Sequence, residues 1–177
     1  MNNPTLLKNI RVIPDFPKPG IQFQDVSTLF DNYECLKIMR DEVVDLYKDK
    51  GITKIVGLES RGFLLASSVA CELEAGVVMA RKPNKLPGET VSQTYEKEYG
   101  TDTICMVKDA INSDDIVLIH DDLLATGGSM HAVYELVKRF NPKKIYINTI
   151  IELRIEGLNG RELIEKDAEY TTLMTIV

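Results

Sequence analysis

The stretch from Ile116 to Met130 constrains the fold more than any other part of the chain. It opens with Ile116-Val-Leu-Ile119, a short apolar run without alternation, which is typical of a strand buried on both faces of a parallel sheet. Asp121 and Asp122 follow almost at once, and the spacing of the apolar residues over 130–140 predicts a helix. The order strand, acidic pair, glycine loop, helix predicts an α/β unit.

The loop of this unit, Ala125-Thr-Gly-Gly-Ser129, has the composition of a phosphate-binding turn. Adjacent glycines let a backbone approach a ligand closely, and the start of a helix offers unpaired N–H groups and a positive dipole end. Carboxylates at the carboxyl end of a parallel strand lie where open α/β sheets bind ligands, so Asp121 and Asp122 could hold sugar hydroxyls, Mg²⁺ or both. The loop has neither the lysine of a Walker A loop nor the G-x-G-x-x-G of a dinucleotide fold.

The apolar run, the Asp-Asp pair and Ala-Thr-Gly-Gly-Ser resemble the signature with which phosphoribosyltransferases of the type I fold bind 5-phosphoribosyl 1-pyrophosphate (PRPP). The resemblance implies that Asp121 and Asp122 contact the ribose hydroxyls. It also implies a 5′-phosphate site made by Ala125, Thr126, Gly127, Gly128 and Ser129. On this stretch alone, a doubly wound domain with a tight turn and a receiver domain with a Mg²⁺-binding acidic pair remain open.

Composition narrows the class of protein. At 177 residues, with 44% hydrophobic and 27% charged residues, the chain is predicted to be one globular domain over residues 1–177. The net charge of −6 argues against a nucleic-acid-binding surface, so a phosphate ligand must meet a local cationic cluster. No signal peptide or membrane span is predicted.

The cysteines and histidines add little chemistry. Three scattered cysteines without a C-x-x-C pattern favour free thiols in a reducing compartment, and we expect a cytoplasmic protein. His120 and His131 have no companions at ligand spacing, so no zinc site is predicted. We expect His120 at the end of the buried strand, and neither histidine to be catalytic.

The N-terminal part, about residues 1–34, is predicted to cover the ligand. Thr5–Val12 is expected to be a short helix, Ile13–Gly20 an extended proline-stiffened segment and Ile21–Ser27 an edge strand. Pro14-Asp-Phe-Pro-Lys-Pro-Gly20 with the residues after it resembles the segment that adenine phosphoribosyltransferases fold over the base, which implies that Phe23 and Gln24 contact it. Many members of that family carry a basic residue where this chain has Gln24, although a glutamine still donates and accepts hydrogen bonds.

The turn Glu59-Ser-Arg-Gly62 separates a predicted strand over 52–58 from a predicted helix. Its N–H groups and guanidinium suit an anion, because arginine pairs with phosphate bidentately. A helix cap with a solvated arginine remains the alternative. The turn resembles the pyrophosphate loop of the family, which commonly holds a non-proline cis peptide, and this implies ligand contacts by Ser60, Arg61 and Gly62.

A basic segment, Arg81-Lys-Pro-Asn-Lys-Leu-Pro-Gly88, follows a predicted strand over 76–80. Such charge runs are usually solvated loops. The segment nevertheless resembles the one that donates cations to pyrophosphate, in several members from the neighbouring subunit. The resemblance therefore implies a homodimer in which Arg81, Lys82 and Lys85 reach the neighbouring site.

The polar stretch Glu89–Asp102 shows no clean period, and a connection of this length is usually a lid or disordered. Tyr95–Gly100 resembles the flexible hood of adenine phosphoribosyltransferases, here a loop over about 82–103; a solvated two-stranded hairpin remains the alternative. The resemblance makes Glu98 and Tyr99 an acidic–aromatic pair near the purine, with Glu98 as candidate acid/base. A similar match near the C-terminus implies that Leu153 packs on the purine.

Together the ordered motifs imply a type I phosphoribosyltransferase fold: an α/β domain whose parallel core sheet is flanked by helices, with a small hood and a flexible lid loop. The implied reaction is adenine plus PRPP giving AMP and pyrophosphate, with Glu98, Asp121, Asp122 and Arg61 as catalytic residues. Mg²⁺ is expected as cofactor, held mainly by PRPP, with Asp121 or Asp122 as a further ligand. Two alternatives stay open: another base, such as hypoxanthine or guanine, and a non-catalytic PRPP or nucleotide sensor, which the acidic charge disfavours.

Overall fold

The structure is a computed structural model that describes residues 2–96, 100–166 and 168–177. Its centre is a parallel sheet of five strands in the order β4-β3-β7-β8-β9. These strands are β3 (Lys54–Leu58), β4 (Gly76–Ala80), β7 (Ile116–Leu124), β8 (Lys144–Leu153) and β9 (Glu169–Ile176). From the middle of the sheet, β3 is followed by β4 on one side, whereas β7 is followed by β8 and β9 on the other side. The direction in which the chain adds strands therefore reverses between β3 and β7. In open α/β sheets such a reversal leaves a ligand-binding crevice at the carboxyl ends of the strands.

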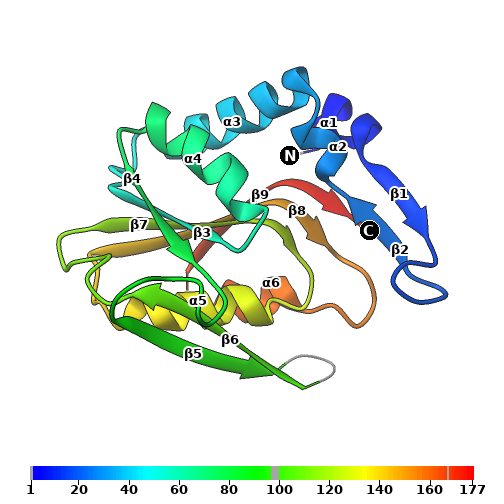
Figure 1. Cartoon of the computed structure of the whole chain (residues 1–177). Coiled ribbons are helices and arrows are strands. Elements are labelled where there is room, and N and C mark those ends of the chain that lie inside the picture. The colour runs from blue at the N-terminus through cyan, green and yellow to red at the C-terminus, as the bar shows by residue number, and fades with distance from the viewer. Residues whose placement is uncertain (1, 97–99, 167) are drawn as a thin grey trace.

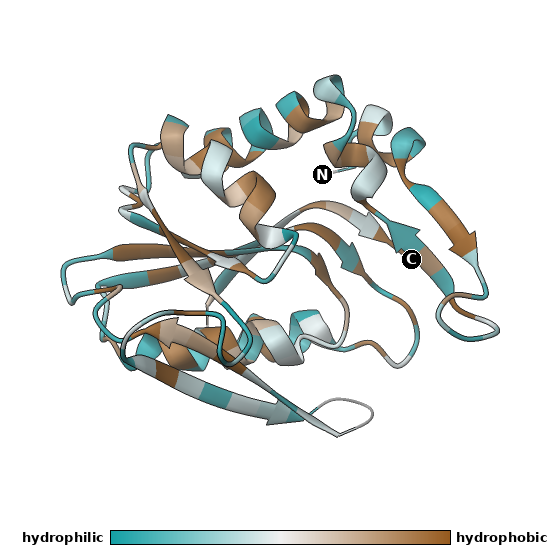
Figure 2. Ribbon diagram, viewed as in Figure 1, coloured by the Kyte–Doolittle hydropathy of each residue, from teal (hydrophilic) through white to brown (hydrophobic). Residues whose placement is uncertain are grey.

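Helices cover both faces of the sheet, as predicted (Figure 1). Helices α3 (Tyr33–Tyr47) and α4 (Gly62–Glu72) lie on one face, and α5 (Gly128–Lys138) and α6 (Gly160–Ile164) on the other. Leu118 packs in the first layer and Ile119 in the second, because successive strand residues point to opposite faces. Figure 2 shows the consequence as brown, apolar segments along the central strands.

Strand β7 is longer than predicted. It continues through Asp121 and Asp122 to Leu124, so His120 lies within the strand and not at its end. The ladder to β3 stops at His120, whereas the ladder to β8 continues to Leu124. Pairing with β8 alone keeps these polar residues extended, and the β3 side of the acidic pair faces the turn that follows β3.

The N-terminal part forms a separate two-stranded sheet of β1 (Arg11–Pro14) and β2 (Gln22–Asp25), flanked by α1 (Pro4–Asn9) and α2 (Ser27–Phe30). The strand predicted within residues 21–27 is confirmed. The predicted helix over residues 5–12 ends too late, and the expectation that residues 13–20 avoid sheet is wrong at Ile13 and Pro14. A proline fits the end of β1 because this strand pairs on one side only and can spare an N–H group.

The described part of the predicted lid is a regular hairpin of β5 (Thr90–Glu96) and β6 (Thr101–Val107). Part of the loop expected over about 82–103 is therefore regular strand, as in the hairpin alternative, and its role as a flexible hood stays a prediction. Side chains along β5 alternate between exposed and half-buried positions, because one face of the hairpin packs on α5, where Arg139 donates to the Ser92 carbonyl at 3.0 Å. Glu98 and Tyr99 lie outside the described residues.

Within the described ranges, no helix combines the length and the apolar composition needed to cross a bilayer.

Candidate active site

The predicted motifs meet at one edge of the central sheet. The Arg81–Gly88 segment follows β4, Glu59–Gly62 follows β3, the acidic pair and glycine loop belong to β7, and Leu153 ends β8. These four strands are parallel neighbours, so their carboxyl ends lie side by side. The β1–β2 sheet and the β5–β6 hairpin extend toward the same end of the molecule (Figure 1).

At the reversal of strand order, Arg61 contacts the acidic pair directly. Its Nε donates a hydrogen bond to Oδ2 of Asp122, a side chain only 8% exposed, while Arg61 itself is 45% exposed. The preceding peptide, Glu59–Ser60, is cis, as the resemblance implied. A cation and a carboxylate from two distant motifs are thus brought together, with the arginine open to solvent.

Gly62 allows this approach because a side chain has no room there. A Cβ at Gly62 would lie 2.8 Å from the His120 carbonyl oxygen and 3.1 Å from Oδ1 of Asp121. The first residue of α4 therefore rests against the backbone of β7. This close contact fixes the pyrophosphate-type turn relative to the acidic pair.

The two carboxyl groups differ in their electrostatics. Loss of solvation raises the pKa of Asp121 well above its ordinary value, and the charge of Asp122 raises it further. The Asp122 N–H donates to Oδ1 of Asp121 at 2.9 Å, and Arg61 pairs with Asp122. Behind them, burial lowers the pKa of His120 to about 4, so this imidazole is neutral near pH 7. Asp121 therefore holds its proton more readily than an exposed aspartate does.

The glycine loop opens α5 in the geometry of an anion site. Gly127 adopts the left-handed conformation, with φ of 81°, and no side chain caps the helix that begins at Gly128. The first N–H groups of an uncapped helix have no intrahelical acceptor, and the helix dipole favours an anion there. Thr126 is exposed and Ser129 half-buried at this helix start.

Gly160, the first residue of α6, contacts the glycine loop and supports it. The sequence did not identify it as a site residue. Its N–H donates to the Ala125 carbonyl at 3.1 Å, and a Cβ at Gly160 would lie 2.3 Å from that oxygen. A Cβ at Gly127 would lie 2.9 Å from the Gly160 Cα. The Leu-x-Gly-Arg pattern at 158–161 was the available signal, but only the fold shows that it touches the loop.

Glu59, the second residue the sequence reasoning missed, joins the turn after β3 to the basic segment. Its Oε2 accepts from the Lys82 N–H at 2.9 Å and lies 3.2 Å from Arg81 Nε. Burial opposes ionisation of Glu59, but these hydrogen bonds outweigh it and lower its pKa. Lys82 Nζ lies 3.7 Å from Asp102 on β6, and Lys85 is exposed. The chain thus holds Arg81 and Lys82 beside its own turn.

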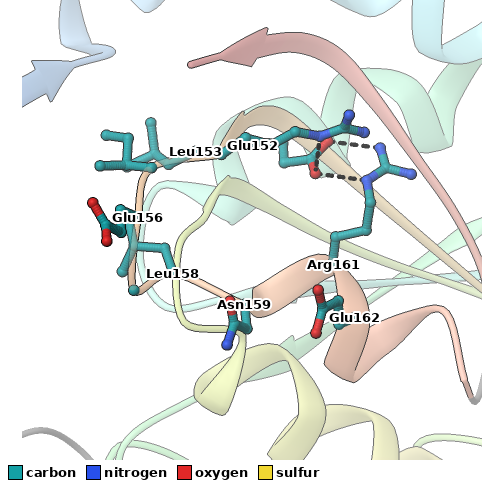
Figure 3. Close-up of a pocket in the computed structure, with 10 residues that line it drawn as sticks. Glu152, Leu153, Glu156, Leu158, Asn159, Arg161 and Glu162 are labelled. Carbon is teal, nitrogen blue, oxygen red and sulfur yellow. Dashed lines mark hydrogen bonds and ion pairs between the residues drawn. The ribbon is translucent and has the colours of Figure 1, made fainter.

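Leu153 lines a hollow of about 550 Å³ formed by residues 152–159, 161 and 162 (Figure 3). Beneath it Glu152, only 1% exposed, accepts from Nε of Arg154 at 2.9 Å and of Arg161 at 2.6 Å. Burial disfavours the charge of Glu152, yet the two arginines lower its pKa overall. A volume of this size suits a small ligand.

Phe23 and Gln24 sit on β2, away from the acidic pair. Phe23 meets Phe16 edge to face with ring centroids 5.1 Å apart, and Gln24 donates to the Gln22 carbonyl at 3.2 Å. Among residues 2–96, 100–166 and 168–177, no hydrogen bond links them to Asp121 or Asp122. The same described residues contain no cluster of three or more His, Cys, Asp or Glu side chains arranged to hold a metal.

Residues 25–176 match the family described as the phosphoribosyl transferase domain. An adenine phosphoribosyltransferase of Phocaeicola vulgatus is 58% identical over 176 residues, covering 99% of this chain and 100% of the relative. The Saccharomyces cerevisiae adenine phosphoribosyltransferase, solved with adenine and an imino-altritol bisphosphate, is similar with a TM-score of 0.87 and 38% identity over 96% of each chain. The Trypanosoma brucei structure with AMP, pyrophosphate and ribose-5-phosphate gives 0.86 and 28%, covering 97% of this chain and 78% of that one.

Proposed function

The chain belongs to the phosphoribosyl transferase family, and we propose that it transfers the phosphoribosyl group of PRPP to adenine, giving AMP and pyrophosphate. The observation that carries the proposal is the meeting of three groups at one crevice: the acidic pair, the uncapped glycine loop and the Glu59–Gly62 turn. Relatives named adenine phosphoribosyltransferase over their whole length support the choice of base. The enzyme is thus a purine-salvage glycosyltransferase.

The charges of the crevice suit the bond that breaks. Cleavage between the anomeric carbon and pyrophosphate leaves positive charge on the ribose and negative charge on the leaving group. Arg61, with Arg81 and Lys82 beside it, stabilises the pyrophosphate, and Asp121 and Asp122 hold the ribose hydroxyls. Removing one preorganised contact of this kind raises a barrier by about 2.7–4 kcal/mol.

The glycine loop fixes the other end of the sugar. Backbone N–H groups from Thr126 to Ser129 bind the 5′-phosphate at the start of α5, where the helix dipole adds to their attraction. Gly160 holds the loop in place from α6. Anchored by this phosphate and by pyrophosphate, the ribose presents its anomeric carbon toward the hollow lined by Leu153.

The adenine stacks between Leu153 and the N-terminal sheet, with Phe23 and Gln24 supplying the opposite contacts. Glu98 and Tyr99 contact the base, and Glu98 manages the purine proton. A closed hairpin excludes water, which would otherwise hydrolyse PRPP. Gln24, in place of a cation, leaves base recognition to neutral hydrogen bonds.

The acidic pair is the part of the site that would hold Mg²⁺. The donor set fits it only in part, since Arg61 occupies Asp122 and burial weakens the ionisation of Asp121. Mg²⁺ usually keeps one or two protein carboxylates and takes its other ligands from substrate phosphate and water. Asp121 or Asp122 would therefore be the protein ligand of a Mg²⁺ held mainly by PRPP, and the ion would supply positive charge to the leaving pyrophosphate.

The functional unit is a cytoplasmic homodimer in which cations of the basic segment serve the neighbouring site. Arg81 and Lys82 already pair with Glu59 and Asp102 of their own chain, so Lys85, exposed beyond them, is the residue best placed to reach across. Scattered cysteines that form no disulfide agree with a reducing compartment.

One assay tests the proposal. Purified protein is given PRPP and Mg²⁺ with adenine, hypoxanthine, guanine or xanthine, and nucleotide and pyrophosphate are quantified by chromatography. AMP from adenine alone is expected. EDTA should abolish turnover and Mg²⁺ restore it.

Arg61→Ala should lose most activity, while Arg40→Ala, an arginine on α3 paired with Asp41, serves as a matched control that retains it. Turnover of another base instead of adenine would show that the enzyme is a phosphoribosyltransferase with a different base specificity. PRPP binding without turnover of any base would make the chain a sensor instead.

A further inference from the structure

A row of hydrogen-bonded polar side chains, buried except for a half-buried threonine, crosses the sheet at the residue before the acidic pair. His120 on β7, Asn148 on β8 and Thr171 on β9 are register partners in adjacent strands. His120 Nδ1 lies 2.9 Å from Asn148 Oδ1, and Asn148 Nδ2 donates to Thr171 Oγ1 at 2.9 Å. Tyr47 of α3 closes the row, with its hydroxyl 2.7 Å from Thr171 Oγ1. Polar groups in a core need this degree of pairing to be tolerated.

The partners of the row fix where its hydrogens lie. The Asn148 amide nitrogen donates to Thr171, so the amide oxygen faces His120 and can only accept. Nδ1 of His120 must therefore carry the ring proton. In the neutral ring, Nε2 is then left as an acceptor, and this atom is fully buried without a hydrogen-bond partner in the described structure.

An apolar side chain would fill the same space without this defect. A buried acceptor left unpaired costs about 1–3 kcal/mol, so the imidazole is a poor choice for stability alone. What distinguishes the position is its place in the strand: His120 is the last residue of β7 paired to β3, and its carbonyl oxygen is the atom against which Gly62 rests. Asp121 and Asp122 come next.

We propose that His120 is a positioning residue for the reaction, whose Nδ1–H bond to Asn148 holds the end of β7 so that Asp121, Asp122 and the Gly62 turn meet the ribose and pyrophosphate of PRPP in register. The inference rests on the proposed function. Losing the anchor shifts the acidic pair away from the ribose and so weakens PRPP binding; a displacement on the order of 1 Å can lower kcat/KM for PRPP by up to about 10²-fold. The effect falls on PRPP and not on adenine, because the base contacts lie on other elements.

Two variants and one control test this role. His120→Phe removes both ring nitrogens, whereas His120→Asn keeps an N–H donor near the Nδ1 position. Tyr47→Phe removes a hydroxyl from the far end of the same row and matches the loss of buried hydrogen bonding. KM for PRPP, KM for adenine, kcat and the unfolding midpoint are measured for all three.

His120→Phe should raise KM for PRPP by about 10-fold or more and leave KM for adenine near wild type, with His120→Asn recovering much of the loss. Tyr47→Phe should lower the unfolding midpoint without changing KM for PRPP. Equal KM values for PRPP in wild type and His120→Phe would overturn the proposal, as would equal losses in His120→Phe and Tyr47→Phe.

A spectroscopic measurement keeps the test valid should the variants fold poorly. The chain has only two histidines, so ¹⁵N-detected imidazole spectra of the wild type contain two rings, and His131→Gln assigns them. We expect the Nδ1–H tautomer for His120 and a change in its shifts when PRPP and Mg²⁺ are added. The opposite tautomer, or shifts indifferent to PRPP, would overturn the role. A wild type that makes no AMP would instead remove the proposed function itself.

Discussion

The geometry of this site depends on two positions that have no room for a Cβ atom as much as on the side chains that line it. Gly62 and Gly160 each occupy a position where one methyl group would collide with backbone oxygen, and each joins a ligand loop to a neighbouring element. Arg61 and Asp122 then meet across the crevice so formed. Gly62 and Gly160 therefore help to position the candidate ligand-binding groups, although neither has a side chain that could bind a ligand.

Gly62→Ala is the sharpest test of this dependence. The new Cβ would approach the His120 carbonyl to 2.8 Å, so the start of α4 must move away from the acidic pair. We expect kcat/KM for PRPP to fall on the order of 10²-fold, measured by AMP formation. Gly76→Ala is the matched control, because its Cβ meets only the flexible Lys54 side chain, at 3.3 Å. Equal activity in the two variants would refute the steric account.

The acidic pair, Arg61 and the glycine loop could be predicted from sequence as site candidates because each motif is local, and the structure brings them to one edge of the sheet. Glu59 and Gly160 were not predicted as site residues, since their roles arise from contacts between loops more than twenty residues apart. No role in the reaction was predicted for His120, whose partners Asn148 and Thr171 are brought beside it only by strand register. Long-range pairing of this kind leaves no recognisable pattern in any short stretch of the sequence.

Among the elements, α6 supports the phosphate loop although it has only five residues. Gly160→Ala would place a Cβ 2.3 Å from the Ala125 carbonyl, which must push α6 and the loop apart. We expect the dissociation constant for AMP, measured by calorimetry, to rise about 10-fold or more. Far-UV circular dichroism should stay unchanged, and an unaltered affinity would show that α6 does not support the loop.

The N-terminal sheet should be the acid-sensitive element. Hydrogen bonds from Ser27, then from Arg11, lower the pKa of Asp25 from 3.8 to about 2. A depressed folded pKa contributes stability above the unfolded pKa and loses it as pH falls through the folded one. Denaturant titrations should therefore show wild type more stable than Asp25→Asn at about pH 6, with the difference shrinking below 3.8 and gone near 2. A difference independent of pH would contradict this.

Element boundaries were predictable to within two residues where the apolar pattern was strong, as in α5 and the strands expected over 52–58 and 76–80. They failed where tertiary pairing overrides local preference. β7 runs four residues past His120 because β8 supplies a partner, and the polar β5 is a strand because α5 supports it. Residues 11–14 form β1 only because β2 folds back on them. The intrinsic preference of residues for helix or strand does not reveal these tertiary contacts.

For the whole molecule, the strand order explains why four separated motifs make one site. β3 and β7 are far apart in sequence yet adjacent at the reversal, with β4 and β8 outside them. The fold class, helices on both faces and a parallel core, was predicted correctly from motif order. The strand order itself was not predicted, because periodicity within strands does not say which strands pair.

At this scale the proposed homodimer can be tested by complementation. A Lys85→Ala chain and an Arg61→Ala chain are each expected to be weakly active; mixed after mild denaturation and refolding, they should regain activity, because one site in the hybrid then has both cations. Sedimentation velocity checks the assembly. Dimers without any recovery would mean that Lys85 serves its own chain, and a monomer would end the dimer proposal.

The contact between Gly160 and the Ala125 carbonyl also bears on how the protein is made. A ligand stabilises only the state that binds it. The phosphate site needs β3, β7 and α6 in place, so a growing polypeptide gains no help from substrate until the residues around Gly160 have left the ribosome. Helix α3 packs in the same core layer as Ile150, Leu173 and Met174, so this early helix also completes its packing only when the last strands are present.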